Sequence, residues 1–368
     1  MNTVLRAVLG WMTVVAVIFT ISTYLVAMVL SVTLVWGTQL EADLSALSIN
    51  GLPPLGGFFI YFRLANVPIS INLLAYVSFC ILVFATCFVA AFRSRGGFLQ
   101  SLGRLPKMGR VTRSSNWLVV MPLLSSGLLV IVVLVTNVLS AAGVPSGTLC
   151  KVNVDCPSTA KLFAGLAHAP IGEELAYRIL TPLALVLPIR MGWRRLMTGQ
   201  GPSNATFLSI IGRSILSPDQ AKMRTGYPSV ALNGWRGIHW LEWIFVAGSA
   251  ITFGLAHVQS GGADWGQGKV VTAAISGAVL AAVFLAYGAF ATILLHWFFD
   301  FYVEVLMLGL PVSGDLTILF ANLVIFGGLF LIGIFSSVIG AAWLGKKILR
   351  KLSPTTYKPP EVSFFPAQ

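Results

Sequence analysis

Charged residues are scarce in this chain of 368 residues: they make up 10% of it, whereas hydrophobic residues make up 57%. The mean hydropathy is +0.86. Soluble globular domains carry charge on about 25% of their residues, because a folded surface must be hydrated. The composition therefore excludes an ordinary soluble protein and predicts a polytopic membrane protein.

Cysteine is also rare, with four residues and no C-x-x-C pair, which excludes a disulfide-rich or zinc-ribbon fold. Cys150 and Cys156 fall in one loop, where the sequence leaves open whether they form a small disulfide. Cys80 and Cys87 are seven residues apart in one apolar segment, so we interpret them as packing residues. No internal repeat or low-complexity tract is present.

Long apolar segments dominate the rest of the sequence. A helix needs about 20 apolar residues to cross the hydrocarbon core. Eight segments meet this requirement: 7–36, 69–92, 117–143, 158–188, 237–258, 269–288, 290–309 and 316–344. The fold class predicted is all-α, a transmembrane bundle of about eight helices.

Basic residues are separated by loop, and lysine and arginine are retained on the cytoplasmic side of short loops. They fill the stretches 93–113 and 190–236 and the tail after 345, whereas the opposite loops hold Glu41, Asp43, Asp155, Asp264 and Asp315. We therefore expect a multi-pass protein of a prokaryotic cell membrane with both termini in the cytoplasm. The net charge of +12 then reflects topology and attraction to the lipid bilayer, and no nucleic-acid partner is expected.

The domain organisation follows from these segments. We expect N-terminal transmembrane helices with an outer loop over 1–150, a core over 151–310 that holds the ionisable motifs described below, a C-terminal transmembrane helix over 311–352 and a cytoplasmic tail over 353–368. The outer loop at 37–68 is expected to include a short interfacial helix near 58–61. The cytoplasmic stretch 190–234 is expected to be a loop without a core of its own.

Ionisable residues inside the apolar segments carry the functional prediction, because charges at membrane depth are costly and usually face a cavity. Glu174 and Arg178 are four residues apart, so they share a helix face and can pair. Glu173 is rotated by about 100° from Glu174, which leaves it as a free carboxylate.

Two later segments add histidines at the same spacing. Phe253 and His257 share one face, and His296 and Asp300 share another, so the aspartate can orient the imidazole. Glu304 continues that face as a further partner or a polar lining residue.

Three other ionisable residues are interpreted as structural. His168 and His239 are expected to make hydrogen bonds between elements, and Glu242 to lie at the membrane interface between tryptophans.

These motifs resemble the signature of the CPBP family of membrane proteases, also called the Abi family, which includes the type II CAAX prenyl endopeptidases. That signature is EExxxR, then FxxxH, then HxxxN or HxxxD, and it is matched in order by Glu173 to Arg178, Phe253 to His257, and His296 to Asp300. The resemblance covers roughly residues 160–305.

The resemblance implies an intramembrane endopeptidase in which Glu173 and His257 activate a water that attacks a peptide bond. It assigns His296 and Asp300 to stabilising the oxyanion, with Glu174, Arg178 and Phe253 supporting the site. The expected partner is a membrane peptide or protein substrate.

Asp300 departs from the asparagine of many relatives, and an ionised aspartate would repel an oxyanion. Either Asp300 is protonated, or it orients His296, or the site binds a metal. Glu173, His257 and His296 would then hold zinc with a water in the open position. We favour metal-independent chemistry with no cofactor, and zinc is the alternative.

Two other functions compete with this one. A transporter would place similar residues along a path, and a catalytically silent membrane scaffold or immunity protein would need no intact site. The predicted helix boundaries also place Glu173 near mid-membrane and His257 near the outer end of its helix, so a shared cavity requires these boundaries to shift.

Overall fold

The structure is a computed structural model that describes residues 3–50, 55–57, 60–62, 70–109, 111–112, 115–148, 158–199, 204–259, 264–309 and 316–352. Within these ranges the chain is almost entirely helical, as the composition predicts. The short strands form three two-stranded pairs, β1 with β4, β2 with β3, and β5 with β6, all antiparallel.

Eight helical segments in the described part of the chain are long and apolar enough to cross a membrane. They are Thr3–Gly37, Leu73–Arg93, Trp117–Ala141, Thr159–Thr198, Trp240–Gln259, Gln267–Tyr287, Ala289–Gly309 and Phe320–Lys346. Each overlaps one of the eight segments predicted from hydropathy. The prediction of an all-α multi-pass membrane protein is confirmed.

The elements follow one another in a simple order. The first half contains α1 (Thr3–Gly37), α2 (Gln39–Ser45), β1 (Ser48–Asn50), β2 (Leu55–Gly57), β3 (Ile60–Phe62), β4 (Ser70–Asn72), α3 (Leu73–Arg93), α4 (Phe98–Met108), α5 (Trp117–Ala141) and β5 (Gly147–Thr148). The second half contains α6 (Thr159–Glu174), η1 (Leu175–Ile179), α7 (Pro182–Thr198), α8 (Asn204–Leu216), α9 (Pro218–Arg224), α10 (Val230–Asn233), η2 (Gly234–Gly237), α11 (Trp240–Gln259), β6 (Asp264–Trp265), α12 (Gln267–Tyr287), α13 (Ala289–Trp297), η3 (Phe298–Tyr302), α14 (Val303–Gly309) and α15 (Leu316–Leu352).

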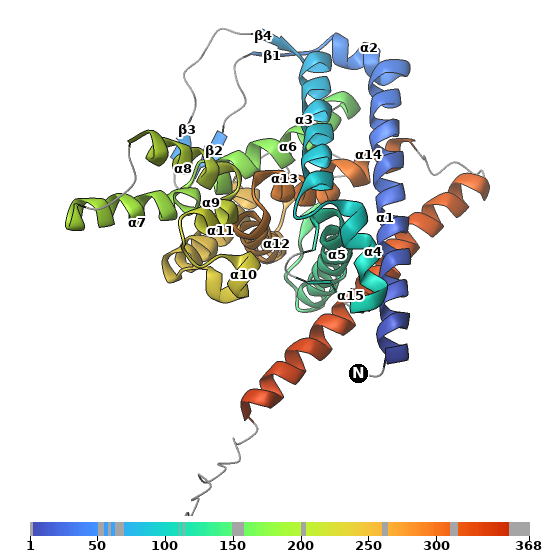
Figure 1. The fold of residues 1–368 in the computed structure, drawn as a ribbon. Coiled ribbons are helices and arrows are strands. Elements are labelled where there is room, and N and C mark those ends of the chain that lie inside the picture. Colours follow the sequence, from blue (N-terminus) through green and yellow to red (C-terminus); the bar gives the residue numbers. More distant parts are fainter. Residues whose placement is uncertain are drawn as a thin grey trace, which may run out of the picture.

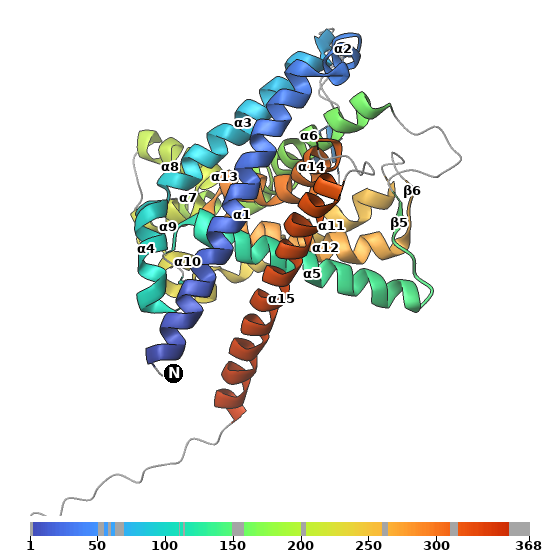
Figure 2. The same cartoon turned by 90° about the vertical axis from the view of Figure 1, so that its right-hand side faces the viewer.

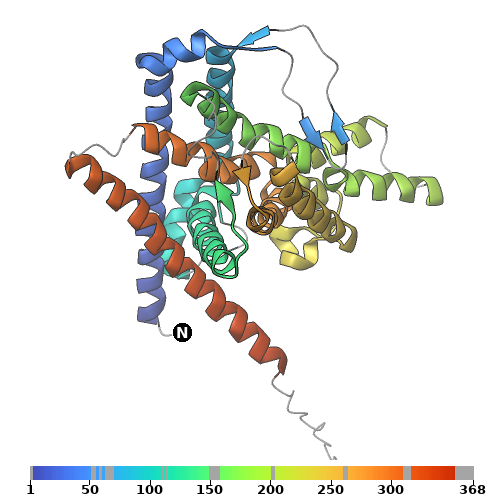
Figure 3. The same ribbon diagram turned by 180° about the vertical axis from the view of Figure 1, so that it is seen from behind.

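The helices cross at steep angles instead of forming a parallel bundle. In Figure 1, α1 and α3 stand upright while α11 and α12 are seen nearly end-on. Figure 2, turned by 90°, shows α5 running across the direction of α1. The long α15 crosses the molecule obliquely, as the rear view in Figure 3 also shows. The central helix is α13, which contacts both α3 and α6.

The interior of this bundle is aromatic. Trp297 and Phe298 are completely buried, and Tyr24 of α1 packs edge-on against both. Tyr302 stacks on Phe298, and its hydroxyl donates to Thr23 at 2.8 Å. This cluster fixes the helix that carries the third motif against α1.

The stretch 190–234, which was expected to be a loop without a core, contains several helices. It contains the end of α7 and the helices α8, α9 and α10. A buried ion pair joins Lys222 Nζ to Glu242 Oε2 at 2.5 Å, and Arg95 pairs with Asp219 at 3.2 Å. The interpretation of Glu242 as an interfacial carboxylate is therefore wrong, because the residue is 2% exposed and paired.

The stretch 37–68 also differs from expectation. Where a short interfacial helix was expected near 58–61, the described residues form the hairpin of β2 and β3. Cys80 and Cys87 are buried and free, as packing residues would be. Cys150, Cys156 and the tail 353–368 lie outside the described residues.

Candidate active site

Two of the three motifs lie where an α-helix widens into a π-helix. Glu173 and Glu174 end α6, and η1 follows at once with Arg178. His296 lies near the end of α13, and η3 follows with Asp300. π-helical turns are rare and occur frequently at functional sites. The sequence predicted one uninterrupted helix over 158–188, and hydropathy carries no signal for such a turn.

The break after η1 has a local cause. Pro182 has no N–H, so it cannot continue the helical hydrogen bonds and instead starts α7. The Tyr177 carbonyl accepts a hydrogen bond from the Ser249 hydroxyl of α11 at 2.9 Å. Side chains that satisfy freed backbone groups in this way allow a broken helix inside a membrane.

Glu174 is completely buried and fully engaged. Its Oε1 lies 2.7 Å from Arg178 Nη1 and 2.8 Å from His296 Nδ1, and its Oε2 accepts from Thr292 Oγ1 at 2.5 Å. Arg178 also donates to the Gly277 carbonyl at 3.4 Å and lies over the Phe253 ring. The predicted pairing of Glu174 with Arg178 is present, and it joins α6, α12 and α13.

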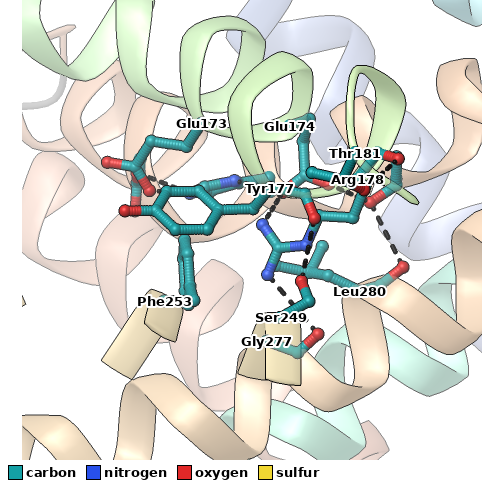
Figure 4. A network of polar contacts seen from close by, with 12 residues as sticks. Glu173, Glu174, Tyr177, Arg178, Thr181, Ser249, Phe253, Gly277 and Leu280 are labelled. Carbon is teal, nitrogen blue, oxygen red and sulfur yellow. Dashed lines mark hydrogen bonds and ion pairs between the residues drawn. The ribbon is translucent and has the colours of Figure 1, made fainter. Parts of the chain in front are cut away.

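Glu173 points in a different direction and remains available. Figure 4 shows its carboxylate on the side of Tyr177 and Phe253, away from the Glu174 pair. Its side chain is 34% exposed, and its Oε2 lies 3.6 Å from His296 Nε2. Among the described residues this buried oxygen has no hydrogen-bond partner. A polar atom in that situation requires water or a ligand.

His296 is held by carboxylates on both sides of its ring. Its Nδ1 faces Glu174, and its Nε2 lies 3.1 Å from Asp300 Oδ2. A carboxylate accepts hydrogen bonds, so an imidazole that donates from both nitrogens is the charged imidazolium. Asp300, whose side chain is 27% exposed, occupies the position from which it can orient the ring.

His257 is oriented by its own helix. Its Nδ1 lies 2.8 Å from the Phe253 carbonyl oxygen. Because a carbonyl can only accept, Nδ1 carries the proton and Nε2 of the neutral ring carries the free electron pair. The Phe253 ring contacts both His257 and His296, with centroids 4.8 and 5.7 Å apart. The three motifs therefore meet around Phe253, and the mismatch in depth expected from the sequence is absent.

The donor set does not fit a zinc ion. Both nitrogens of His296 face carboxylate oxygens, so this ring has no free electron pair for a metal. Of the predicted ligands, His257 then offers Nε2 and Glu173 one carboxylate, so this set supplies fewer than the three protein ligands usual for catalytic zinc. Among the described residues no three acidic, histidine or cysteine side chains form a group that could hold a metal ion.

Sequence reasoning missed two residues around this site. Thr292, which donates to Glu174, precedes His296 by four residues. That spacing indicated that the two side chains share one face of the helix. Lys269 directly precedes Val270, whose carbonyl oxygen faces Gly254 of α11. It therefore lies near the start of α12, beside the end of α11 that carries His257. The sequence signal for Lys269 was that it is one of few basic residues in the loops predicted to be acidic.

The remaining buried histidine outside the motifs has a structural partner. His168 Nδ1 bonds to the Tyr76 hydroxyl, which joins α6 to α3. His239 lies just before α11, where its Nδ1 accepts from the Leu241 N–H at 3.3 Å, so this hydrogen bond is local and not the expected one between helices. Glu304 is half-buried in α14.

Comparison with known proteins agrees with the motif resemblance. Residues 156–302 match the family model described as type II CAAX prenyl endopeptidase Rce1-like. This range includes all three motifs and both π-helices. No curated protein and no solved structure gives a significant match to the chain. Residues 156–302, which are less than half of the chain, are thus similar to the Rce1-like type II CAAX prenyl endopeptidases.

Proposed function

We propose that this membrane protein is an intramembrane endopeptidase that hydrolyses a peptide bond of a membrane-associated or lipidated peptide or protein. The carrying observation is the contrast between two adjacent carboxylates. Both carboxylate oxygens of Glu174 accept hydrogen bonds, from Arg178, His296 and Thr292. Glu173, in contrast, has a buried oxygen near His296 that has no hydrogen-bond partner among the described residues. The family match supports a protease of the CAAX type.

In the proposed mechanism Glu173 is the general base. A water bound between its carboxylate and the free Nε2 of His257 loses a proton to Glu173 as its oxygen attacks the carbonyl carbon. A positioned base of this kind contributes about 100- to 10,000-fold to a rate. The proton then passes to the departing amine, so that the amide is replaced by an acid and an amine.

His296 supplies the positive charge for the oxyanion. As an imidazolium beside Glu173, it can share its Nε2 proton between Asp300 and the tetrahedral oxygen. Preorganised donors of this kind often contribute more to the rate of acyl transfer than any other single effect. Asp300 then acts by orienting His296, which removes the expected repulsion between an ionised aspartate and the oxyanion. No step in this mechanism uses a metal.

The test is cleavage of labelled membrane peptides, with and without a prenylated cysteine, by the purified protein in detergent. We expect cleavage that is lost in Glu173→Ala and unchanged by a chelator. Loss on chelation with rescue by zinc would show the metal-dependent alternative. Cleavage that persists in Glu173→Ala would contradict the site. Failure of the folded native protein to cleave any peptide in the panel would favour a silent scaffold.

A further inference from the structure

A cavity lies away from the candidate active site. It has a volume of about 1570 Å³ and is bordered by α1, α5 and α15. None of the motif residues lines it. Pockets for drug-sized ligands measure about 300–1,000 Å³, so this cavity suits a larger molecule. We refer to it as the α1–α15 cavity.

The shape of the cavity follows from the helix directions. The N-terminal half of α1 and the C-terminal half of α15 diverge in all three views, and α5 packs closely on α15 (Figure 1, Figure 2 and Figure 3). α5 can approach α15 because Gly127 faces Ser336, with an added Cβ only 2.7 Å from the serine oxygen. The wedge between α1 and α15 therefore opens toward the end of the bundle where α1 begins.

The charges of the cavity lie at that open end. Arg6 and Lys346 are its charged lining residues, and both are exposed. Neither forms an ion pair with a described residue, and no acidic side chain lines the described cavity. Trp343 lies beside Lys346 on α15, at the headgroup level that tryptophan prefers. The opening thus combines two free cations with an interfacial ring.

The deeper wall is apolar. Leu9, Leu123, Leu124 and Phe335 line it, together with small residues of α5 and α15. At about 1.5 Å per residue, the helical wall runs about 10 Å from Arg6 to Thr13 and about 16 Å from Lys346 to Phe335. One leaflet of the hydrocarbon core is about 15 Å deep. The cavity therefore has the depth and polarity gradient of a lipid in a single leaflet.

We propose that the α1–α15 cavity holds one anionic phospholipid, with its phosphate between Arg6 and Lys346 and its acyl chains against α5 and α15. An even number of membrane crossings places Arg6 and Lys346 on the same side of the membrane, and both line the cavity, so both cations face the same leaflet as the headgroup of a lipid bound there. The C-terminal half of α15 is largely exposed, and the lipid would attach this half to the rest of the bundle. A zwitterionic lipid would fill the same volume but would gain less from two unpaired cations.

The test is native mass spectrometry of the full-length protein with equimolar phosphatidylglycerol and phosphatidylcholine of identical acyl chains. We expect one retained lipid, with phosphatidylglycerol preferred. One Lys or Arg near a membrane surface contributes about 5-fold to anionic-lipid binding, so Arg6→Gln/Lys346→Gln should reduce the preference by about 30-fold. The matched control Arg194→Gln/Arg224→Gln removes two exposed cations from α7 and α9 and should keep the preference.

Two further measurements distinguish this site from a surface effect. Leu123→Trp fills the cavity without changing a charge, so it should reduce retention of both lipids. Glycerol phosphate, which has the headgroup charge without acyl chains, should not displace the bound lipid. Equal retention of both lipids by the native protein, equal loss of preference in the control, or displacement by glycerol phosphate would overturn the proposal.

Discussion

Glu174 Oε1 lies 2.8 Å from Nδ1 of His296, although the two residues are 122 positions apart in the chain. This contact joins the first motif to the third inside the membrane, where neither group is solvated. It also fixes the direction of Nε2, which faces Asp300 and Glu173. The pair therefore determines where a positive charge lies relative to the free carboxylate.

Replacement of Thr292 tests whether the contact between Glu174 and His296 depends on the hydrogen bond that Thr292 donates to Glu174. Thr292→Val keeps the shape but removes the donor to Glu174 Oε2. Interhelical hydrogen bonds in membranes contribute up to about 1.7 kcal/mol, and charged acceptors lie toward the upper end. We expect the free energy of unfolding to fall by about 1.5 kcal/mol and cleavage to slow, because Glu174 and His296 lose their alignment. Thr292→Ser is the matched control and should behave like the native protein in thermal unfolding and cleavage.

Glu173 and Glu174 are expected to have different roles: loss of the charge partner of Glu174 should lower stability, whereas loss of the Glu173 charge should lower activity. Arg178→Met removes the arginine from the buried Glu174 and leaves His296 as its remaining charged partner; breaking a buried ion pair costs about 3–5 kcal/mol. Glu173→Gln removes a carboxylate that has no ion pair with an arginine or lysine in the described structure, so thermal stability should be unchanged. Cleavage by Glu173→Gln should fall by about 100-fold or more, because the general base is lost. A large loss of stability in Glu173→Gln would contradict its role as the free carboxylate.

A second buried ion pair joins α9 to α11. Lys222 donates to Glu242 Oε2 and to the Gly237 carbonyl, and both charged side chains are 2% exposed. Lys222→Met should therefore destabilise the protein by about 3–5 kcal/mol, measured by thermal unfolding. The double variant Lys222→Met/Glu242→Gln also removes the Glu242 charge that Lys222→Met leaves buried and unpaired, so it should recover most of that stability. No recovery would show that the lysine acts through packing alone.

The sequence predicted the fold class because the eight apolar segments are a one-dimensional property of the chain. It also predicted the Glu174–Arg178 pair, because residues four apart share a helix face. The meeting of His257 with His296 was harder, since hydropathy indicates span boundaries and not crossing angles. Phe253 contacts His257 four residues further along α11, as the spacing indicates, but its contact with His296 of α13 is a tertiary contact that no spacing rule encodes.

Glu242 shows where sequence reasoning failed. Its neighbours Trp240 and Trp243 indicated an interfacial position, and both rings are indeed exposed. The partner, Lys222, belongs to a separate helix that was expected to be loop. A buried ion pair between separate elements requires the tertiary fold, and the glycine and proline content of the stretch indicated a loop without a core.

Close packing of α11 on α12 should control the position of His257. A Cβ at Gly254 would lie 2.4 Å from the Val270 carbonyl oxygen, which is backbone and cannot rotate away. Gly254→Ala should therefore separate the two helices and shift His257, which lies one turn further along α11. We expect lower thermal stability and slower cleavage, although alanine is the better helix former by about 1 kcal/mol. Gly165→Ala in α6 is the matched control, because no atom lies within 4 Å of its added Cβ, and it should be neutral or slightly stabilising. If the two variants behaved alike in unfolding and cleavage, the α11–α12 contact would not position His257.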